Sequence, residues 1–140
     1  MKRRLFALLL AATPLFCQAA TLDAPLACTV SAHQFVSGLI DQNLIQPHAM
    51  RVESNSINAF WPMHDADVTA FGFRVFAIVG YEKDDPIFRT GSGEPVGKSA
   101  YGAVVIGSDS KVQSAVTAAG SPAIVRHVGP LMTAIFCPRS

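Results

Sequence analysis

The chain has 140 residues, half of them apolar and 15% charged, and this length and composition suit one globular domain. Lys and Arg number 11 against 10 Asp and Glu, so the formal net charge is only +1. A charge so close to zero implies no basic face, and nucleic acid is therefore excluded as an expected partner.

The first residues have the order of a secretory signal peptide. Lys2–Arg4 form a positive cluster, Leu5–Ala12 form an apolar run, and small residues follow at Cys17–Ala19. The apolar run is shorter than the roughly 20 residues that span a bilayer. We therefore predict cleavage after Ala19, with Ala20 as the second choice; a retained membrane anchor is the alternative.

Removal of this leader defines the expected exported chain. Residues 1–19 are the signal peptide, and residues 20–140 form a single domain in the periplasm. The exported chain keeps eight Lys and Arg and all ten acidic residues, which gives a net charge of −2. It contains no second apolar run long enough to cross a membrane, so we expect no membrane span after cleavage.

Two cysteines remain in the exported chain, Cys28 and Cys137. An even number of cysteines in an oxidising compartment predicts a disulfide, and two buried free thiols are the alternative. The bridge would close a loop of about 110 residues, which the chain-entropy description values at roughly 4–5 kcal/mol. Two thiols without a C-x-x-C pair do not suit zinc, so we expect no metal site.

The first half of the exported chain predicts one helix followed by strands. Apolar residues recur every three or four positions over residues 29–45, which indicates a helix that a hydroxyl of Thr29 or Ser31 caps and Pro47 ends. Residues 50–61 predict one long strand or two short ones with a kink at Asn55.

The next segments predict a turn at residues 62–67 and then the strongest strand of the chain, Val68–Tyr81. Both faces of this strand are largely apolar, so we expect it at the centre of the sheet. The remaining elements are a polar loop over 82–98, a strand over 101–106, a helix that begins at Ser108 or Asp109 and ends near Gly120, and strands over 123–128 and 131–136 joined by Gly129-Pro130.

This order of elements predicts an α+β fold. We expect a single small domain with a mostly antiparallel sheet of about five strands, two helices on one face, and the disulfide closing the chain.

The loop sequence GSGEPVGKS over residues 91–99 resembles a phosphate-binding loop but departs from it. Such a loop needs glycine five positions before Gly97, where Ser92 stands, and a helix must follow. Here a strand follows, and an exported protein does not meet cytoplasmic ATP. We therefore expect no nucleotide and no other cofactor, and we interpret the glycines as backbone that needs conformational freedom.

Four histidines and one serine are the candidates for chemistry. His64 lies beside two carboxylates in a turn, where a metal ligand or a general base is possible, but a hydrated turn is the favoured interpretation. Ser108 lies at a strand-to-helix turn, where an N-cap explains it. His33, His48 and His127 are scattered, and we interpret them as structural. The sequence thus predicts no catalytic residue and no enzyme.

The candidate binding site is the start of the 82–98 loop. Aromatic and Arg side chains are typical of binding hot spots, and acidic side chains steer the approach of a partner. The alternative is a hairpin whose Ile87 and Phe88 fold back onto the core. The predicted partner-binding residues are Tyr81, Glu82, Asp84, Asp85, Phe88 and Arg89.

Three functions remain open on the sequence. The first is a periplasmic inhibitor or immunity protein that binds a cell-envelope-acting toxin enzyme and blocks it by steric occlusion with the 82–98 loop. This hypothesis rests on association, because small exported domains without visible catalytic residues often have this role. The others are a periplasmic small-molecule-binding or envelope accessory module with an apolar pocket, and a small hydrolase that depends on His64 or His127.

Overall fold

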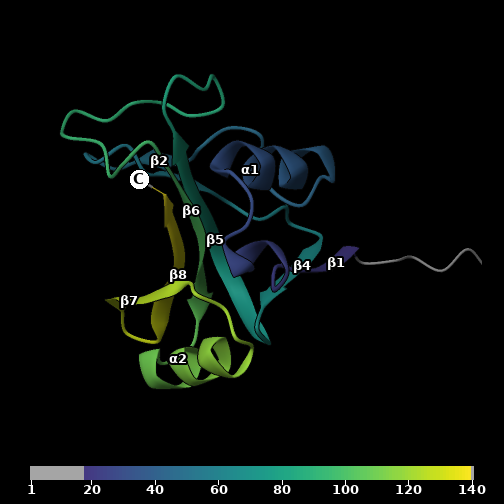
Figure 1. The fold of residues 1–140 in the computed structure, drawn as a ribbon. Coiled ribbons are helices and arrows are strands. Elements are labelled where there is room, and N and C mark those ends of the chain that lie inside the picture. Colours follow the sequence, from purple (N-terminus) through teal and green to yellow (C-terminus); the bar gives the residue numbers. More distant parts are fainter. Residues whose placement is uncertain (1–17, 140) are drawn as a thin grey trace, which may run out of the picture.

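The structure, a computed structural model, describes residues 18–139 (Figure 1). The signal-peptide features predicted within residues 1–17 lie outside this part. The described chain has eight strands and two α-helices, so the α+β class is confirmed, whereas the expectation of about five strands is wrong. In chain order the elements are β1 Gln18–Thr21, the 3-10 helix η1 Pro25–Ala27, α1 Ala32–Asp41, β2 Arg51–Val52, β3 Asn58–Phe60, β4 Ala66–Ala70, β5 Phe73–Glu82, β6 Ser99–Ile106, α2 Asp109–Ala118, β7 Ile124–Gly129 and β8 Met132–Arg139.

The strands form one sheet in the order β1-β4-β5-β6-β8-β7, with β2 and β3 joined to β5. All neighbours are antiparallel except β1 and β4. Strand β5 pairs with β4 through its first two residues, with β3 further along, and with β6 on its other side. The expectation that this segment lies at the centre of the sheet is therefore confirmed.

The expected single strand over 68–81 is wrong, because a tight turn divides it. Phe71 and Gly72 both have positive φ, of 50° and 85°. This is the backbone that a two-residue hairpin turn of type I′ requires, and it joins β4 to β5. Phenylalanine is uncommon at a turn position with positive φ. Because the apolar side chain of Phe71 fits the strand pattern, the sequence did not indicate the turn.

Helix α1 begins with a capping box. The Ser31 hydroxyl accepts a hydrogen bond from the Gln34 N–H at 3.1 Å, and the Gln34 side chain accepts one from the Ser31 N–H at 3.0 Å. The helix ends at Asp41, before the predicted residue 45, because Asn43 adopts a left-handed φ of 56°.

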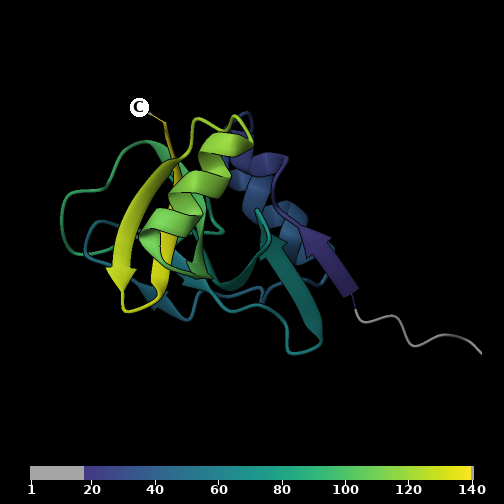
Figure 2. The same cartoon turned by 90° about the horizontal axis from the view of Figure 1, so that it is seen from below.

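Both helices pack on the same face of the sheet, as expected. Helix α1 lies against β5 and β6, and α2 lies against β7 and β8 (Figures 1 and 2). Between the helices and the sheet lies one continuous core, which is completely buried at its centre. Its largest members include Leu26, Phe35, Tyr101, Val112 and Ile135.

The disulfide between Cys28 and Cys137 is confirmed. It joins the end of η1 to β8 across a sequence separation of 109 residues, and the Cys137 side chain is buried in the helix-covered core. The bridge therefore closes almost the whole described chain into one loop. Within residues 18–139, no helix is long and apolar enough to cross a membrane.

Candidate functional site

Five of the six predicted partner-binding residues line one hollow of about 460 Å³, and Arg89 is not among its lining residues; the five are Tyr81, Glu82, Asp84, Asp85 and Phe88. Tyr81 and Phe88 belong to the buried core, with only 5% and 7% of their surface exposed. Asp84 and Arg89 are exposed, and the Arg89 guanidinium donates to the Ala49 carbonyl at 2.8 Å. The aromatic members of the proposed hot spot therefore stabilise the fold from inside, as the alternative of a folded-back hairpin expects.

The 82–98 loop is anchored rather than projecting freely. The side chain of Asn58, which is fully buried, donates to the carbonyls of Ser56 and Arg89 at 2.9 and 2.8 Å and accepts from the Arg89 N–H at 2.9 Å. Further along, the N–H groups of Gly93 and Val96 donate to backbone carbonyls in the 54–55 segment. The loop thus lies against residues 54–58 along much of its length.

The glycine-rich stretch has a packing role in this arrangement. A side chain at Gly91 would overlap the Glu53 carbonyl, and one at Gly93 would press against the Ser54 carbonyl at 3.1 Å. The Gly91 N–H donates to the Ser56 hydroxyl at 2.9 Å. These contacts explain why glycine stands here: it lets two backbone segments approach closely.

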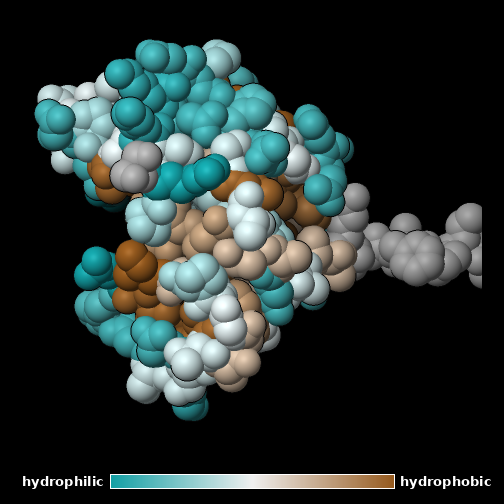
Figure 3. All heavy atoms as spheres, in the orientation of Figure 1, coloured by the Kyte–Doolittle hydropathy of each residue, from teal (hydrophilic) through white to brown (hydrophobic). Residues whose placement is uncertain are grey.

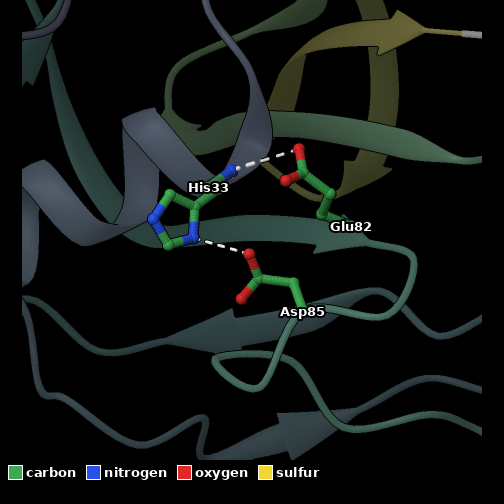
Figure 4. A group of neighbouring side chains, drawn as sticks. All are labelled: His33, Glu82 and Asp85. Carbon is green, nitrogen blue, oxygen red and sulfur yellow. Dashed lines mark hydrogen bonds and ion pairs between the residues drawn. The ribbon is translucent and has the colours of Figure 1, made fainter.

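A polar cluster joins the loop to the first turn of α1 (Figure 4). His33 Nδ1 lies 2.5 Å from an Asp85 carboxylate oxygen, and the His33 N–H donates to Glu82 at 3.4 Å. Ser99 donates to the same Glu82 oxygen at 3.0 Å. The ligand atoms of the three ionisable side chains lie within 4.8 Å of one another, a set that suits a transition-metal ion.

The position of this cluster favours a structural role. Both carboxylates face the helix N-terminus, where free N–H groups and the helix dipole stabilise negative charge. The other oxygen of Asp85 accepts from the Ile87 N–H at 2.9 Å, which shapes the loop turn. A bound cation would be opposed by the same dipole. The cluster therefore caps α1 and fixes the loop to it.

A second polar cluster lies at the start of α2. His127 Nδ1 is 2.7 Å from one Asp109 oxygen, and the buried Thr133 hydroxyl is 2.6 Å from the other. A nucleophile needs a base beside it, but here the carboxylate stands between the hydroxyl and the imidazole. Ser108 is the N-cap residue of α2, and its side chain makes no capping hydrogen bond. This arrangement joins α2 to β7 and β8.

Asp109 makes the stability of the fold depend on pH. The hydrogen bond from Thr133 is the main cause that lowers the pKa of Asp109, and the hydrogen bond and charge of His127 lower it further. A carboxyl with a lowered pKa stabilises the fold above its unfolded pKa of 3.8, and this contribution disappears as pH falls through the folded value.

Thermal unfolding measured from pH 6 to pH 2 should show that the wild-type protein melts at a higher temperature than Asp109→Asn, and that this difference shrinks below about pH 4. Asp41→Asn, at the end of α1, is the control for loss of one carboxylate; an advantage independent of pH would contradict this role.

The face of the sheet opposite the helices is open, concave and apolar. Two adjoining hollows of about 450 and 520 Å³ lie on it, and both are lined by Val79, Val104 and Val128. Figure 3 shows apolar side chains gathered where the molecule is indented, between two more polar lobes. We call this surface the open face; its other main apolar members are Ile57, Ala59, Trp61, Phe76, Ala77, Ile124, Met132, Ala134 and Phe136.

An exposed aromatic pair stands on the open face. The rings of Trp61 and Phe76 meet edge to face, with centroids 5.1 Å apart, and they are 44% and 37% exposed. The β5–β6 register shifts between Val75 and Ala77, so Phe76 occupies a bulge. A bulge interrupts the alternation of side chains, which explains how the consecutive residues Phe76 and Ala77 both lie on the open face while Val75 packs in the helix-covered core.

A third hollow, of about 430 Å³, adjoins the open face at Phe76 and is also lined by Val68 and Val75, which belong to the helix-covered core. His64 and Arg74 line it together with Ile106, Val68 and neighbouring residues. Sequence reasoning placed His64 in a hydrated turn and did not place it beside this hollow. The signal for the open face was present in the sequence, because the strands are apolar on both sides and the helices can cover only one of them.

Comparison with known proteins adds no family to this geometry. No protein-family model, no curated protein and no solved structure matches the chain.

Proposed function

We propose that this protein is an exported protein-binding module of the inhibitor or immunity class, and that it holds its partner on the open face. The partner would be an enzyme that acts on the cell envelope, blocked because the bound protein covers its active site. The observation that carries the proposal is the exposed Trp61–Phe76 pair on a concave apolar surface.

The exposure of this surface supports a binding role. Besides the aromatic pair, Ile124 and Val128 are 37% and 50% exposed. Apolar side chains gathered on one surface of a soluble protein are typical of interaction sites, because their hydration is unfavourable until a partner covers them. Aromatic residues near the centre of such a surface supply most of the binding energy in many interfaces.

The rigidity of the open face also supports tight binding. Most of its residues lie on paired strands, and Trp61, which directly follows β3, accepts a hydrogen bond at its carbonyl from the Gln46 N–H at 2.8 Å. The 82–98 loop that borders the open face is fixed by the Asn58 side chain and by the backbone carbonyls of residues 54–55. A surface that is ordered before binding loses little conformational entropy when the partner docks. In this proposal the loop borders the binding site, and its acidic residues do not make the main contacts with the partner.

The disulfide supports the proposed compartment. Disulfides persist in the periplasm and outside the cell and are rare in the cytosol. The Cys28–Cys137 bridge is therefore consistent with export by the predicted signal peptide. Cleavage after Ala19 would leave Ala20 and Thr21 of β1 paired with Val68 and Thr69 of β4.

The size of the hollows favours one alternative, a small-molecule-binding module. Volumes of about 450 and 520 Å³ fall within the usual range for ligand pockets. Both are broad hollows on a sheet surface, however, and the space between the helices and the sheet is filled by the core. An extended partner covers such a surface more completely than a compact ligand does.

The test uses the exported protein and a loop control. The partner is the protein that co-purifies with the exported protein from envelope extract. Trp61→Ala with Phe76→Ala is expected to weaken binding to this partner at least 30-fold, which is the effect of removing a central aromatic hot spot. Asp84→Lys with Glu94→Lys, two exposed loop positions, is expected to change binding less than threefold. The affinities are measured by calorimetry with both proteins purified. The opposite ranking of the two variants would overturn the proposal.

A further inference from the structure

The charges around the open face differ in sign from those of the rest of the protein. Residues 18–139 carry eight Lys and Arg and ten Asp and Glu, a net charge of −2. The three hollows, however, are lined by three arginines, a histidine and a single acid, Glu53. The other nine acidic residues of the described chain lie elsewhere. The side chains that line the open face therefore carry more positive than negative charge, on a protein whose net charge is negative.

Arg74 and Arg126 lie in the two hollows that adjoin the middle one, and we call the three hollows together the groove. The hollow that holds His64 and Arg74 shares Phe76 with the middle hollow. The middle hollow, of about 520 Å³, in turn shares Val79, Val104 and Val128 with the hollow of about 450 Å³ that holds Arg126. The middle is apolar, and its one ion pair, between Arg51 and Glu53 at 2.8 Å, is internally neutral.

The two end arginines have their guanidinium groups available. Among the interactions of residues 18–139, no ion pair or side-chain hydrogen bond engages Arg74 or Arg126, and both residues are exposed. Arg guanidinium groups bind carboxylates with paired hydrogen bonds, and such charge pairs set which partner is accepted.

We infer that the open face binds a segment of a partner protein that is apolar in its middle and acidic at both ends. This inference rests on the proposed function and adds the chemistry of the partner. The apolar middle of the segment covers Trp61, Phe76 and the three valines that line the middle hollow. Its acidic ends pair with Arg74 on one side and Arg126 on the other.

Other occupants match the groove less well. A second copy docked face to face would bring like charges together at the rim. A flat membrane surface would not contact the recessed valines of the groove, because Val79 and Val104 are only 9% exposed whereas Val128 beside them is 50% exposed. A fatty acid carries one carboxylate and would satisfy one end only.

The test selects peptides without assuming a sequence. A random twelve-residue phage-displayed library is selected on the disulfide-bonded exported protein, and binders to Trp61→Ala with Phe76→Ala are removed. The expected survivors have an apolar centre and Asp or Glu at both ends. Their synthetic forms should lose about tenfold or more in affinity on Arg74→Gln with Arg126→Gln, and bind more weakly as salt rises. Lys111→Gln, an exposed cation on α2, is the matched control and should leave affinity unchanged.

The possible results separate the two claims. Survivors that are neutral or basic would overturn the charge inference and leave the aromatic binding surface in place. A library with no survivors that depend on the aromatic pair would overturn both. Direct binding of dodecanoate, measured in parallel, identifies the lipid case. If dodecanoate binds, its binding is lost on Arg74→Gln alone and no peptide is selected, the groove takes a fatty acid and not a protein segment.

Discussion

Removal of the disulfide by Cys28→Ser with Cys137→Ser is expected to lower the free energy of unfolding by about 4 kcal/mol. The bridge closes a loop of 109 residues, and so long a loop restricts the unfolded chain strongly. Domains of this size are stable by roughly 5–15 kcal/mol, so the variant would lose a large share of its stability. Urea unfolding of the two proteins gives the comparison.

Reduction of the wild-type protein provides the control for this experiment. Because the effect belongs to the covalent link and not to the serine side chains, the reduced wild type and the double variant should unfold at nearly the same urea concentration. A loss of less than about 1 kcal/mol in the variant would show that the bridge restrains little of the unfolded chain.

Asn58→Ala is expected to cost about 3 kcal/mol, because it breaks three hydrogen bonds at a fully buried site. The Arg89 N–H and carbonyl and the Ser56 carbonyl would lose their partner, and leaving such groups unsatisfied costs about 1–3 kcal/mol each, partly offset where water reaches them. The 82–98 loop should also detach, so the Gly93 and Val96 amides should exchange hydrogen faster.

Asn55→Ala is the matched control for this prediction. Its side chain accepts one local hydrogen bond, from the Ile57 N–H at 3.2 Å, and holds no part of the loop. Its expected cost is below about 1 kcal/mol, without faster exchange at Gly93. Equal costs for the two asparagines would contradict the claim that Asn58 is the anchor of the loop.

Local signals in the sequence predicted much of the fold. Four features depend on chemistry that neighbouring residues or composition reveal. They are the cap of α1, predicted at Thr29 or Ser31 and found at Ser31; Gly120 after α2; the break near Asn55, predicted within one long strand or between two short ones and found between two; and the Cys28–Cys137 pair. The hairpin at Phe71 was missed because its side chain fits a strand pattern while its backbone does not.

Contacts between distant residues determined what the sequence did not predict. The burial of Phe88 depends on Asn58, which lies in another strand and holds the loop from 31 residues away. The open face exists because both helices pack on the same side of the sheet. The strands β5 and β8 are apolar on both sides, so their sequence does not indicate which side stays uncovered. The candidate binding surface could therefore be placed on the sheet, and not on the loop, only from the packing of the helices.

Site-specific photo-crosslinking in the producing cells tests the central claim most directly. A photo-reactive phenylalanine analogue is placed one site at a time at Phe76 and Val128 on the open face, at Glu94 on the loop, and at Gln113 on α2. The account predicts one shared protein adduct from Phe76 and Val128 and none from Glu94 or Gln113. Adducts from the loop or helix positions alone, with none from the open face, would contradict it.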